Sequence, residues 1–303
     1  MLSFPHFPPS TLRIPTMHST PTPAARRRAL NDLLDAGRTV VVPGCHDALS
    51  AMLAAEAGFE VGYVGSYATA AADLGLPDVG ALGLDDLVHR ARRVADAVPV
   101  PVVADAEGGF HEPGNIWRTV RAFEDAGVAA IHIEDHAGGK HTDLPQTLIP
   151  LDAMLARLRA ARDARRDPAF RIVARTDAVW ATGDPAEALR RVRAFAQAGI
   201  DTVFPTGAPP DMIAAFKAEV PAHYVVIDGP NHPSFAGRES AASLVLYYGF
   251  SLFAAARAMT AALGRFRADP AADLDDLFEP VDRFEARLGY AAFTERARRY
   301  GQG

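Results

Sequence analysis

Several apolar segments of this chain end in an acidic residue or an arginine. Asp105 and Glu107 follow a Val-Val-Ala run, Glu134 follows Ile-His-Ile, and Arg175 follows Ile-Val-Ala. If these segments are parallel strands of a repeated β/α fold, their carboxyl ends lie on one face and the side chains converge. Carboxylate oxygens are ligands of Mg²⁺, and a guanidinium binds planar anions. The pattern therefore predicts a divalent-cation site beside a site for an anionic substrate.

A structural role is the alternative for each of these residues taken alone. An acid at a strand end can cap the next helix or pair with an arginine, and Arg175 can pair with Asp177 instead of a substrate. Asp105 and Glu107, however, precede two glycines that let the backbone approach a ligand closely. The combination of these two acids with Glu134 favours a site.

The elements that must position these residues are eight short apolar segments that alternate with helical segments. The expected strands are Thr39–Pro43, Val61–Val64, Pro101–Asp105, Ala129–Glu134, Arg171–Arg175, Thr202–Pro205, Tyr224–Ile227 and Ser243–Tyr247. Continuous Val, Ile and Ala runs are typical of strands buried on both faces. Eight alternations, with no G-x-G-x-x-G after the first strand, favour an α/β fold of the (β/α)8 TIM-barrel type over an open doubly wound sheet.

Length and composition are consistent with one barrel and exclude other classes. The chain has 303 residues, and a barrel needs roughly 250, so residues 24–303 are expected to form a single barrel domain with extra N- and C-terminal helices. Residues 1–23 are expected to be a disordered extension, with a transit peptide as the alternative. The net charge of −6 without a basic stripe argues against nucleic-acid binding.

Cysteine content and hydropathy bear on location. Cys45 is the only cysteine, so no disulfide can form within the chain, which fits a reducing cytoplasm. No apolar run approaches the ~18 residues of a membrane span. We therefore expect a cytoplasmic protein with no membrane partner.

Five segments resemble the isocitrate lyase/phosphoenolpyruvate mutase superfamily. They are Pro43–Ala51, Leu74–Gly80, Ala104–Gly109, Ile131–Asp135 and Ile172–Ala178, and the resemblance runs from about Leu30 to Met259 with order and spacing kept. It implies a (β/α)8 barrel with Mg²⁺ at its mouth, Mn²⁺ being an alternative. It also implies a homo-oligomer, either a dimer or a tetramer, and a small anionic substrate similar to a 2-oxo acid.

The resemblance also implies roles for individual residues. Asp105 would contact the metal most directly, and Asp78, Glu107 and Glu134 would hold its water shell. Arg175 would bind a substrate carboxylate. Backbone amides near Gly65, Ser66 and Tyr67 would bind a 2-oxo oxygen, and Asn231 lies in a loop expected to line the mouth. Members of this superfamily make or break a bond next to a pyruvate-like enolate, which the metal stabilises as a Lewis acid.

The loop over 136–147 departs from the branches of this superfamily. Thr142 stands near the place of the lyase cysteine, and a hydroxyl is too weakly acidic to replace a thiol, so cleavage of isocitrate or methylisocitrate is not expected. Lys140 matches the lysine of the mutase and phosphonopyruvate hydrolase branch, but Thr142 replaces its asparagine. The Lys-x-Thr-Asp-Leu segment looks more like the oxaloacetate decarboxylase branch.

Other departures concern residues around the expected metal. Glu107 replaces the usual aspartate, and Thr206 replaces a common glutamate, which indicates an altered substrate. His141 and His46 are the expected proton carriers, because histidine titrates near neutral pH. His132 is expected to face the barrel wall.

These observations predict an enzyme: a Mg²⁺-dependent carbon–carbon lyase or decarboxylase. Its substrate would be a small 2-oxo or 2-hydroxy dicarboxylate that reacts through a metal-stabilised enolate. One alternative is a phosphonopyruvate or phosphoenolpyruvate mutase or hydrolase, with Lys140 and Thr142 near the phosphoryl group. The other is a non-catalytic barrel that binds 2-oxo acids.

Overall fold

The sheet contains eight parallel strands that close on themselves. They are β1 (Val40–Pro43), β2 (Gly62–Val64), β3 (Val102–Asp105), β4 (Ala130–Glu134), β7 (Arg171–Thr176), β8 (Thr202–Pro205), β9 (His223–Asp228) and β10 (Leu244–Tyr247). Their order is β1-β10-β9-β8-β7-β4-β3-β2, and a parallel bridge between Gly44 and Tyr63 joins β1 to β2. The computed structural model, which describes residues 21–229 and 241–301, thus confirms the predicted (β/α)8 barrel and all eight strands.

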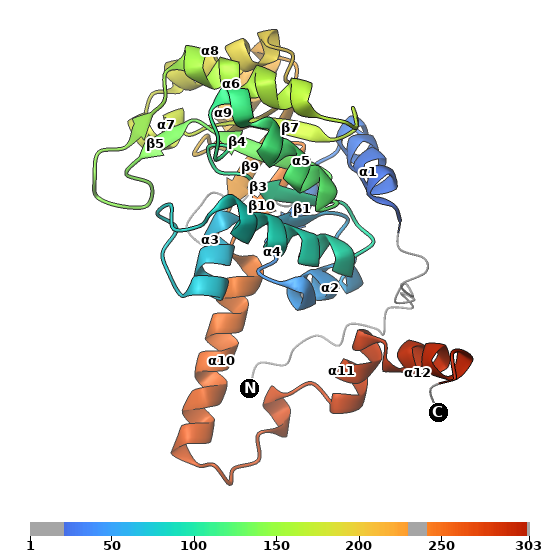
Figure 1. Ribbon diagram of the computed structural model, residues 1–303. Coiled ribbons are helices and arrows are strands. Elements are labelled where there is room, and N and C mark those ends of the chain that lie inside the picture. The colour runs from blue at the N-terminus through green and yellow to red at the C-terminus, as the bar shows by residue number, and fades with distance from the viewer. Residues whose placement is uncertain (1–20, 230–240, 302–303) are drawn as a thin grey trace. The chain divides into compact units, whose positions relative to one another are not determined.

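Helices surround this sheet (Figure 1). They are α2 (Ala48–Glu56), α4 (Leu84–Ala97), α5 (Trp117–Asp125), α6 (Leu151–Ala164), α7 (Ala178–Thr182), α8 (Pro185–Gln197) and α9 (Pro210–Glu219), with a 3₁₀ turn at Pro113–Asn115 before α5. Strand residues that face the helices pack on side chains such as Leu87, Phe123, Leu158 and Phe195, all fully buried. Each such side chain contributes roughly 1.5–3 kcal/mol by leaving water.

Two segments that follow strands contain additional regular structure. Residues 65–83 include helix α3 (Ser66–Thr69) and a π-helical turn (Ala70–Leu74), which Gly75 ends with a left-handed φ of 63°. The segment after β4 contains a small antiparallel hairpin, β5 (His136–Gly138) and β6 (Thr147–Leu148). Both segments follow the carboxyl ends of strands, so they lie at the mouth of the barrel.

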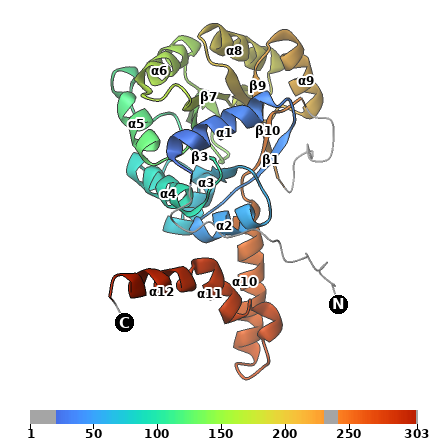
Figure 2. The same ribbon diagram turned by 90° about the vertical axis from the view of Figure 1, so that its right-hand side faces the viewer.

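Helix α1 (Pro23–Asp35) covers the opposite end of the barrel, as Figure 2 shows. Leu30 and Leu34 are buried in the cluster that fills the barrel interior. Arg26 is 4% exposed and donates hydrogen bonds to the carbonyls of Ala95, Val98 and Gly127. These carbonyls lie at or just after the carboxyl ends of α4 and α5, where helices leave backbone acceptors without partners. The guanidinium therefore fixes α1 to two barrel helices.

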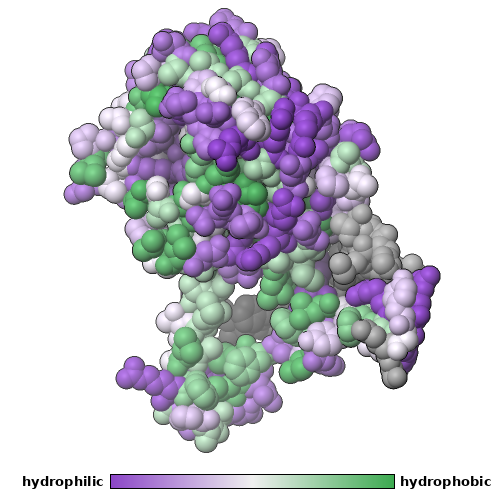
Figure 3. Space-filling model, in the orientation of Figure 1, coloured by the Kyte–Doolittle hydropathy of each residue, from purple (hydrophilic) through white to green (hydrophobic). Residues whose placement is uncertain are grey.

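The chain divides into two compact units, Pro21–Leu252 and a second that contains the chain from Phe253 onward. The second unit contains most of α10 (Phe250–Ala268), a 3₁₀ turn (Asp275–Leu277), α11 (Val281–Leu288) and α12 (Tyr290–Arg299). Apolar side chains lie exposed on this unit (Figure 3), among them Met259, Leu263 and Phe266, and no residue of α10 is buried.

The remaining predictions about organisation concern the chain ends. The single domain over 24–303 stays a prediction, and most of the predicted extension over 1–23 lies outside the described residues. Among the described residues, no helix is long and apolar enough to cross a membrane.

Candidate active site

Alternating side chains carry polar groups from the strands into the barrel interior. Near the start of the strands the inward residues are apolar, for example Val103 and Val173, and belong to the interior cluster. Two residues further along, the same face presents Asp105 and Arg175, because side chains of a strand alternate with a period of two. Glu134 and Thr206 are placed in the same way. The strand ends therefore meet at one mouth, as expected from the sequence.

Four carboxylates converge at this mouth around the ammonium group of Lys140. The Nζ atom lies 2.9 Å from Glu107 Oε2, 3.0 Å from Glu134 Oε1 and 3.6 Å from Asp78 Oδ2. Lys140 comes from the hairpin loop after β4. Asp78 and Glu107 come from the segments that follow β2 and β3, and Glu134 is the last residue of β4. The fourth carboxylate, Asp105, adjoins Asp78 through Ser66, whose Oγ lies 2.9 and 3.2 Å from their Oδ2 atoms.

Asp105 is the most firmly held of these acids. It is 2% exposed, and its carboxylate accepts hydrogen bonds from the amides of Ser66 and Glu107 at 3.2 and 2.8 Å. His132 Nδ1 lies 3.5 Å from Asp105 Oδ1. Burial alone would raise the pKa of Asp105, but the nearby His132, Lys140 and Arg175 outweigh it and lower the pKa. Asp105 is therefore ionised and fixed in orientation.

Glu107 reaches the cluster from an unusual backbone conformation. Its φ of 47° lies in the left-handed region, which costs a side chain other than glycine roughly 1–2 kcal/mol. The hydrogen bond from the Glu134 amide to the Glu107 carbonyl, at 2.9 Å, holds this turn against the next strand. The turn directs the longer side chain of Glu107 back to Lys140.

Burial without full neutralisation raises the pKa of two carboxylates. Desolvation raises the pKa of Glu134 to about 8 although Arg175 and Lys140 are close. The pKa of Glu107 is also raised, first by desolvation and then by the charge of Asp105. The same acids act on Lys140: desolvation would lower its pKa, but Glu134 and the other carboxylates raise it well above the ordinary value. The cluster thus holds more negative charge than its cations neutralise.

Arg175 links this cluster to a second set of buried polar groups. Its Nε and Nη2 donate to the two oxygens of Asp177 at 2.8 and 3.0 Å, and its Nη1 lies 3.0 Å from Glu134 Oε2. His136 Nδ1 lies 3.0 Å from Asp177 Oδ2, and the Asp177 amide donates to Asp135. A guanidinium carries more N–H donors than these contacts use, so Arg175 retains donors for an anion in the cavity.

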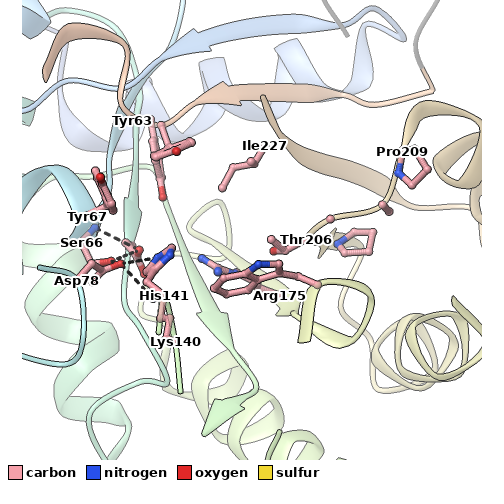
Figure 4. Close-up of a pocket in the computed structure, with 17 residues that line it drawn as sticks. Tyr63, Ser66, Tyr67, Asp78, Lys140, His141, Arg175, Thr206, Pro209 and Ile227 are labelled. Atoms are coloured by element: carbon pink, nitrogen blue, oxygen red, sulfur yellow. Dashed lines mark hydrogen bonds and ion pairs between the residues drawn. The ribbon is translucent and has the colours of Figure 1, made fainter. Parts of the chain in front are cut away.

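A cavity of about 220 Å³ opens above these groups (Figure 4). Its charged lining residues are Asp78, Asp105, Lys140 and Arg175. The remaining described lining residues are Tyr63, Gly65, Ser66, Tyr67, His141, Trp180, Pro205, Thr206, Gly207, Ala208, Pro209, Ile227 and Tyr248. The close-up shows Asp78, Lys140 and His141 at one end and Thr206, Pro209 and Ile227 at the other, with Arg175 between them.

His141 is held above the cavity by two aromatic rings and one acid. Its Nε2 lies 3.3 Å from Asp78 Oδ2, and its ring lies 5.8 Å from that of Tyr67 and 5.1 Å from that of Trp180. Its φ of 59° is left-handed. The Trp180 ring also packs on His136, the histidine whose Nδ1 contacts Asp177. Trp180 therefore contacts both histidines.

The structure brings most of the predicted site residues together but not all. His46 is absent from the described lining of the cavity, and its Nδ1 lies 2.8 Å from Ser251 Oγ. Thr142 is exposed and donates to the Gly139 carbonyl at 2.8 Å. Asn231 lies outside the described residues.

One sequence expectation is wrong, and several residues were missed. His132 does not face the barrel wall: it is 1% exposed in the interior, where Nε2 lies 3.0 Å from the Tyr63 hydroxyl. Its spacing of two from Glu134 could have indicated this face. The alternation of side chains along a strand could likewise have indicated that Ile227 faces the interior. Trp180 lies in a short helix that follows a strand, and no such alternation applies to it.

The donor set fits a divalent cation. Asp105, His132 and Glu134 offer ligand atoms within 4.8 Å of one another, and Asp78 and Glu107 lie in the same cluster through Lys140. Mg²⁺ binds few protein carboxylates and keeps waters, and the cluster has carboxylates beyond those that one ammonium can neutralise. The buried Asp, His and Glu side chains could therefore hold a metal.

Comparison with known proteins now identifies the family. Residues 30–267 match the family model described as phosphoenolpyruvate phosphomutase. The chain belongs to this family, within the phosphoenolpyruvate mutase/isocitrate lyase superfamily. It is 32% identical over 285 residues to the 2,3-dimethylmalate lyase of Eubacterium barkeri, covering 90% of this chain and 98% of the relative. It is 35% identical over 221 residues to the oxaloacetate decarboxylase of Bradyrhizobium sp. (strain BTAi1 / ATCC BAA-1182), covering 70% and 74%.

A solved structure adds a ligand-bound relative. A phosphonopyruvate hydrolase in complex with oxalate and Mg²⁺ is similar to this chain with a TM-score of 0.80 and 26% identity, over 91% of this chain and 99% of the hydrolase. These findings confirm the predicted superfamily and the prediction of an enzyme, since the relatives are named lyases and decarboxylases.

Proposed function

We propose that this protein is a Mg²⁺-dependent carbon–carbon lyase or decarboxylase for a small 2-oxo or 2-hydroxy dicarboxylate. The observation that carries the proposal is the meeting of four carboxylates and Arg175 at the edge of one cavity. The named relatives that act on small carboxylates support it.

The metal would be held at the acid cluster. Asp105 is the proposed direct ligand, and Asp78, Glu107 and Glu134 would hold the surrounding waters. A divalent cation bound there supplies Lewis-acid stabilisation of negative charge on the substrate oxygen. The relative with Mg²⁺ and oxalate supports the choice of Mg²⁺, and Mn²⁺ is the alternative.

The chain's own residues would bind and orient the substrate. Arg175 is fixed by Asp177 and Glu134, so its guanidinium can hold a carboxylate without losing much conformational entropy. Backbone amides near Gly65, Ser66 and Tyr67 would bind the 2-oxo oxygen. The Ser66 amide donates to Asp105, which places this stretch of backbone beside the proposed metal ligand.

Among the histidines, we propose His141 as the proton carrier. It lines the cavity and contacts Asp78, whereas His46 is hydrogen-bonded to Ser251. A general acid must come within hydrogen-bond reach of the atom it protonates, and this geometry favours His141. Tyr67 and Trp180 would keep its ring over the cavity.

The two alternatives receive less support from the contacts. A mutase or hydrolase that used Thr142 near a phosphoryl group would need its hydroxyl in the cavity, but that hydroxyl bonds Gly139 in an exposed loop. A non-catalytic barrel would not need the acid cluster to carry excess negative charge beside a proton carrier. We therefore favour the lyase.

Product release with and without EDTA tests this function. We expect 2-oxo acid formation from oxaloacetate or a malate-type substrate with Mg²⁺, and loss of turnover with EDTA. Asp105→Asn should reduce kcat at least about a hundredfold, on the scale seen when one electrostatic group is removed from an active site. Asp85→Asn is the matched control because this acid is exposed on α4. Equal turnover with EDTA and with Mg²⁺ would contradict the proposal.

We also propose that the protein is a homo-oligomer. The apolar side chains exposed on α10 to α12 form a larger set than a monomer usually leaves in water. A second copy of the chain could cover them. Sedimentation of the full chain tests this, and a monomer at micromolar concentration would contradict it.

A further inference from the structure

A second cavity lies at the end of the barrel that α1 covers (Figure 2), opposite the candidate active site. Its volume is about 100 Å³, and its lining comes from α1, the end of α6, the start of β7 and the turn before β8. Arg171 is the first residue of β7, and about 13 Å of strand separates it from Arg175 at the mouth. The described linings of the two cavities share no residue, so this cavity is a separate feature of the molecule.

The lining of this second cavity carries more arginines than acids. Arg162, Arg165 and Arg171 line it, and Asp201 is the only acid among its described lining residues. Arg171 Nη1 lies 2.7 Å from Asp201 Oδ1, and Arg162 Nη2 lies 3.0 Å from Asp163, its neighbour in the sequence. Arg165 forms no ion pair with an acid among the described residues. One guanidinium of the cavity therefore has no counter-charge in direct contact.

Backbone carbonyls hold the guanidinium of Arg165. Its Nε donates to the Arg162 carbonyl at 3.0 Å, and its Nη1 donates to the carbonyls of Phe170 and Pro168 at 2.9 and 3.4 Å. An arginine that follows the end of a helix often has this structural role, but the role uses only these two nitrogens. Nη2 has no acceptor among the described residues and is not enclosed by protein, so it can donate to a ligand.

Arg171 has the same combination of fixed and unused donors. Its Nε donates to Asn31 Oδ1 at 2.6 Å, and its Nη1 donates to Asp201 Oδ1 and Thr202 Oγ1 at 2.7 and 2.9 Å. These bonds fix the guanidinium, and the side chain is 12% exposed. Its Nη2 likewise has no acceptor among the described residues and is not enclosed. The cavity therefore has two fixed guanidiniums, from separate segments of the chain, that each retain a donor nitrogen.

The mutual repulsion of these arginines favours an anion between them. Burial lowers the pKa of Arg165, and Arg162 and Arg171 lower it further, while Asp201 and Glu124 oppose this shift only in part. A bound anion would relieve the repulsion. Guanidiniums match the oxygens of carboxylate and phosphate groups, and a phosphate group, whose oxygens point in several directions, can accept from two guanidiniums on separate segments. The arrangement therefore favours a phosphate group over a single carboxylate.

We propose that this cavity is a binding site for a phosphate group, with Nη2 of Arg165 and Nη2 of Arg171 donating to its oxygens. The ligand is inorganic phosphate or the phosphate of a small monoester, which share this chemistry. A phosphate bound here would join the end of α6 to the start of β7 and so stabilise the folded chain. The site lies outside the proposed reaction and does not rest on it.

Calorimetry of the full chain at constant ionic strength tests the site, with inorganic phosphate and glycerol 3-phosphate as probes and chloride as the balancing anion. We expect saturable binding of phosphate and a rise in Tm that grows with its concentration. Tighter binding of glycerol 3-phosphate would assign the site to a monoester, and tighter binding of inorganic phosphate would assign it to the free ion. Absence of saturable binding of both probes would overturn the proposal.

Variants then assign the binding to this cavity. Arg165→Met should weaken phosphate binding at least about tenfold, the scale of one charge-assisted hydrogen bond, and Arg165→Lys should weaken it less because the charge remains. Arg159→Met is the matched control, since this arginine is exposed on the same helix. Binding that Arg165→Met leaves unchanged, or that Arg159→Met weakens equally, would place the phosphate elsewhere, the mouth with Arg175 included, and the proposal would be wrong.

A gain of affinity provides a test that does not depend on the Arg165 variants folding. Asp201→Asn removes the only acid of the described lining and keeps an oxygen for Arg171, and the Asp201 side chain is 71% exposed. Phosphate binding should tighten about two- to fivefold, the scale of one partly exposed charge pair. Unchanged or weaker binding by this variant would show that the phosphate does not lie beside Asp201.

Discussion

Replacement of Lys140 by methionine should destabilise the protein in a way that depends on pH. The ammonium group contacts Glu107, Glu134 and Asp78 at 2.9, 3.0 and 3.6 Å, and the side chain is 11% exposed. One such pair is worth roughly 5 kcal/mol of attraction at an effective dielectric constant near 20, most of which desolvation offsets. Removing one partner of a buried pair costs about 3–5 kcal/mol, and we expect about 3 kcal/mol for Lys140→Met at pH 8.5.

The sign of the pH dependence follows from Glu134. Its pKa in the folded protein is raised to about 8, so its contribution to stability is full below the unfolded pKa and is lost as pH rises through 8. At pH 5.5 Glu134 is largely protonated and leaves less negative charge for Lys140 to neutralise. The loss of unfolding free energy caused by Lys140→Met should therefore fall to about 1 kcal/mol. Added Mg²⁺ should narrow the gap at pH 8.5, because a cation can replace the missing ammonium and should therefore bind the variant more tightly than the unmodified protein; a ligand at a hundred times its Kd stabilises by about 2.7 kcal/mol.

Thermal unfolding at two pH values measures this. A change of 1 kcal/mol corresponds to about 2–4 °C for a domain of this size, so Lys140→Met should lower Tm by roughly 6–12 °C at pH 8.5 and 2–4 °C at pH 5.5. The matched control is Lys217→Met, which removes the only other lysine, an exposed one. Equal losses at both pH values, or a gap that Mg²⁺ leaves unchanged, would refute the electrostatic reasoning.

Three further outcomes are expected. Mg²⁺ binding should release up to about one proton at pH 7, and its affinity should rise between pH 6 and 8, because Glu134 with a pKa of about 8 must ionise. Calorimetry in two buffers measures the proton release, and Glu134→Gln should abolish that release. Arg26→Met should cost roughly 2–4 kcal/mol in urea unfolding, because it leaves buried carbonyls without a donor, whereas exposed Arg28→Met should cost little. Thr142→Val should change kcat/KM by less than about threefold, because its hydroxyl bonds only within the loop; a loss of a hundredfold would favour the mutase-type reading instead.

The strand ends could be predicted from the sequence for a physical reason. Barrel strands are buried on both faces, so each appears as a short continuous apolar run, and the run ends where polar residues begin to meet water and ligand. Asp105, Glu134 and Arg175 were found in this way, and the structure places all three at the mouth. Their convergence depended only on the parallel arrangement of the strands.

The rest of the site depends on loop conformation, which has no periodicity to read. Lys140 reaches the acids only because the chain after β4 folds into a hairpin, and Glu107 reaches them only through a left-handed backbone. Trp180 packs between two histidines across segments that are not neighbours in sequence. Such contacts arise from tertiary packing, so the sequence could indicate residue types but not partners.

The two substitutions noted near the mouth act at opposite ends of the cavity. Glu107 keeps the negative charge of an aspartate, and its contact with Lys140 shows that the extra methylene is absorbed within the acid cluster. Thr206, in contrast, places a neutral hydroxyl where a glutamate is common, at the end lined by Ile227 and Pro209. Glu107 thus conserves charge where the metal would bind, and Thr206 removes charge at the other end of the cavity. Together these changes should alter which substrate is bound more than how it reacts. Differences in substrate should therefore follow residue 206 and its neighbours, while dependence on a divalent cation should not.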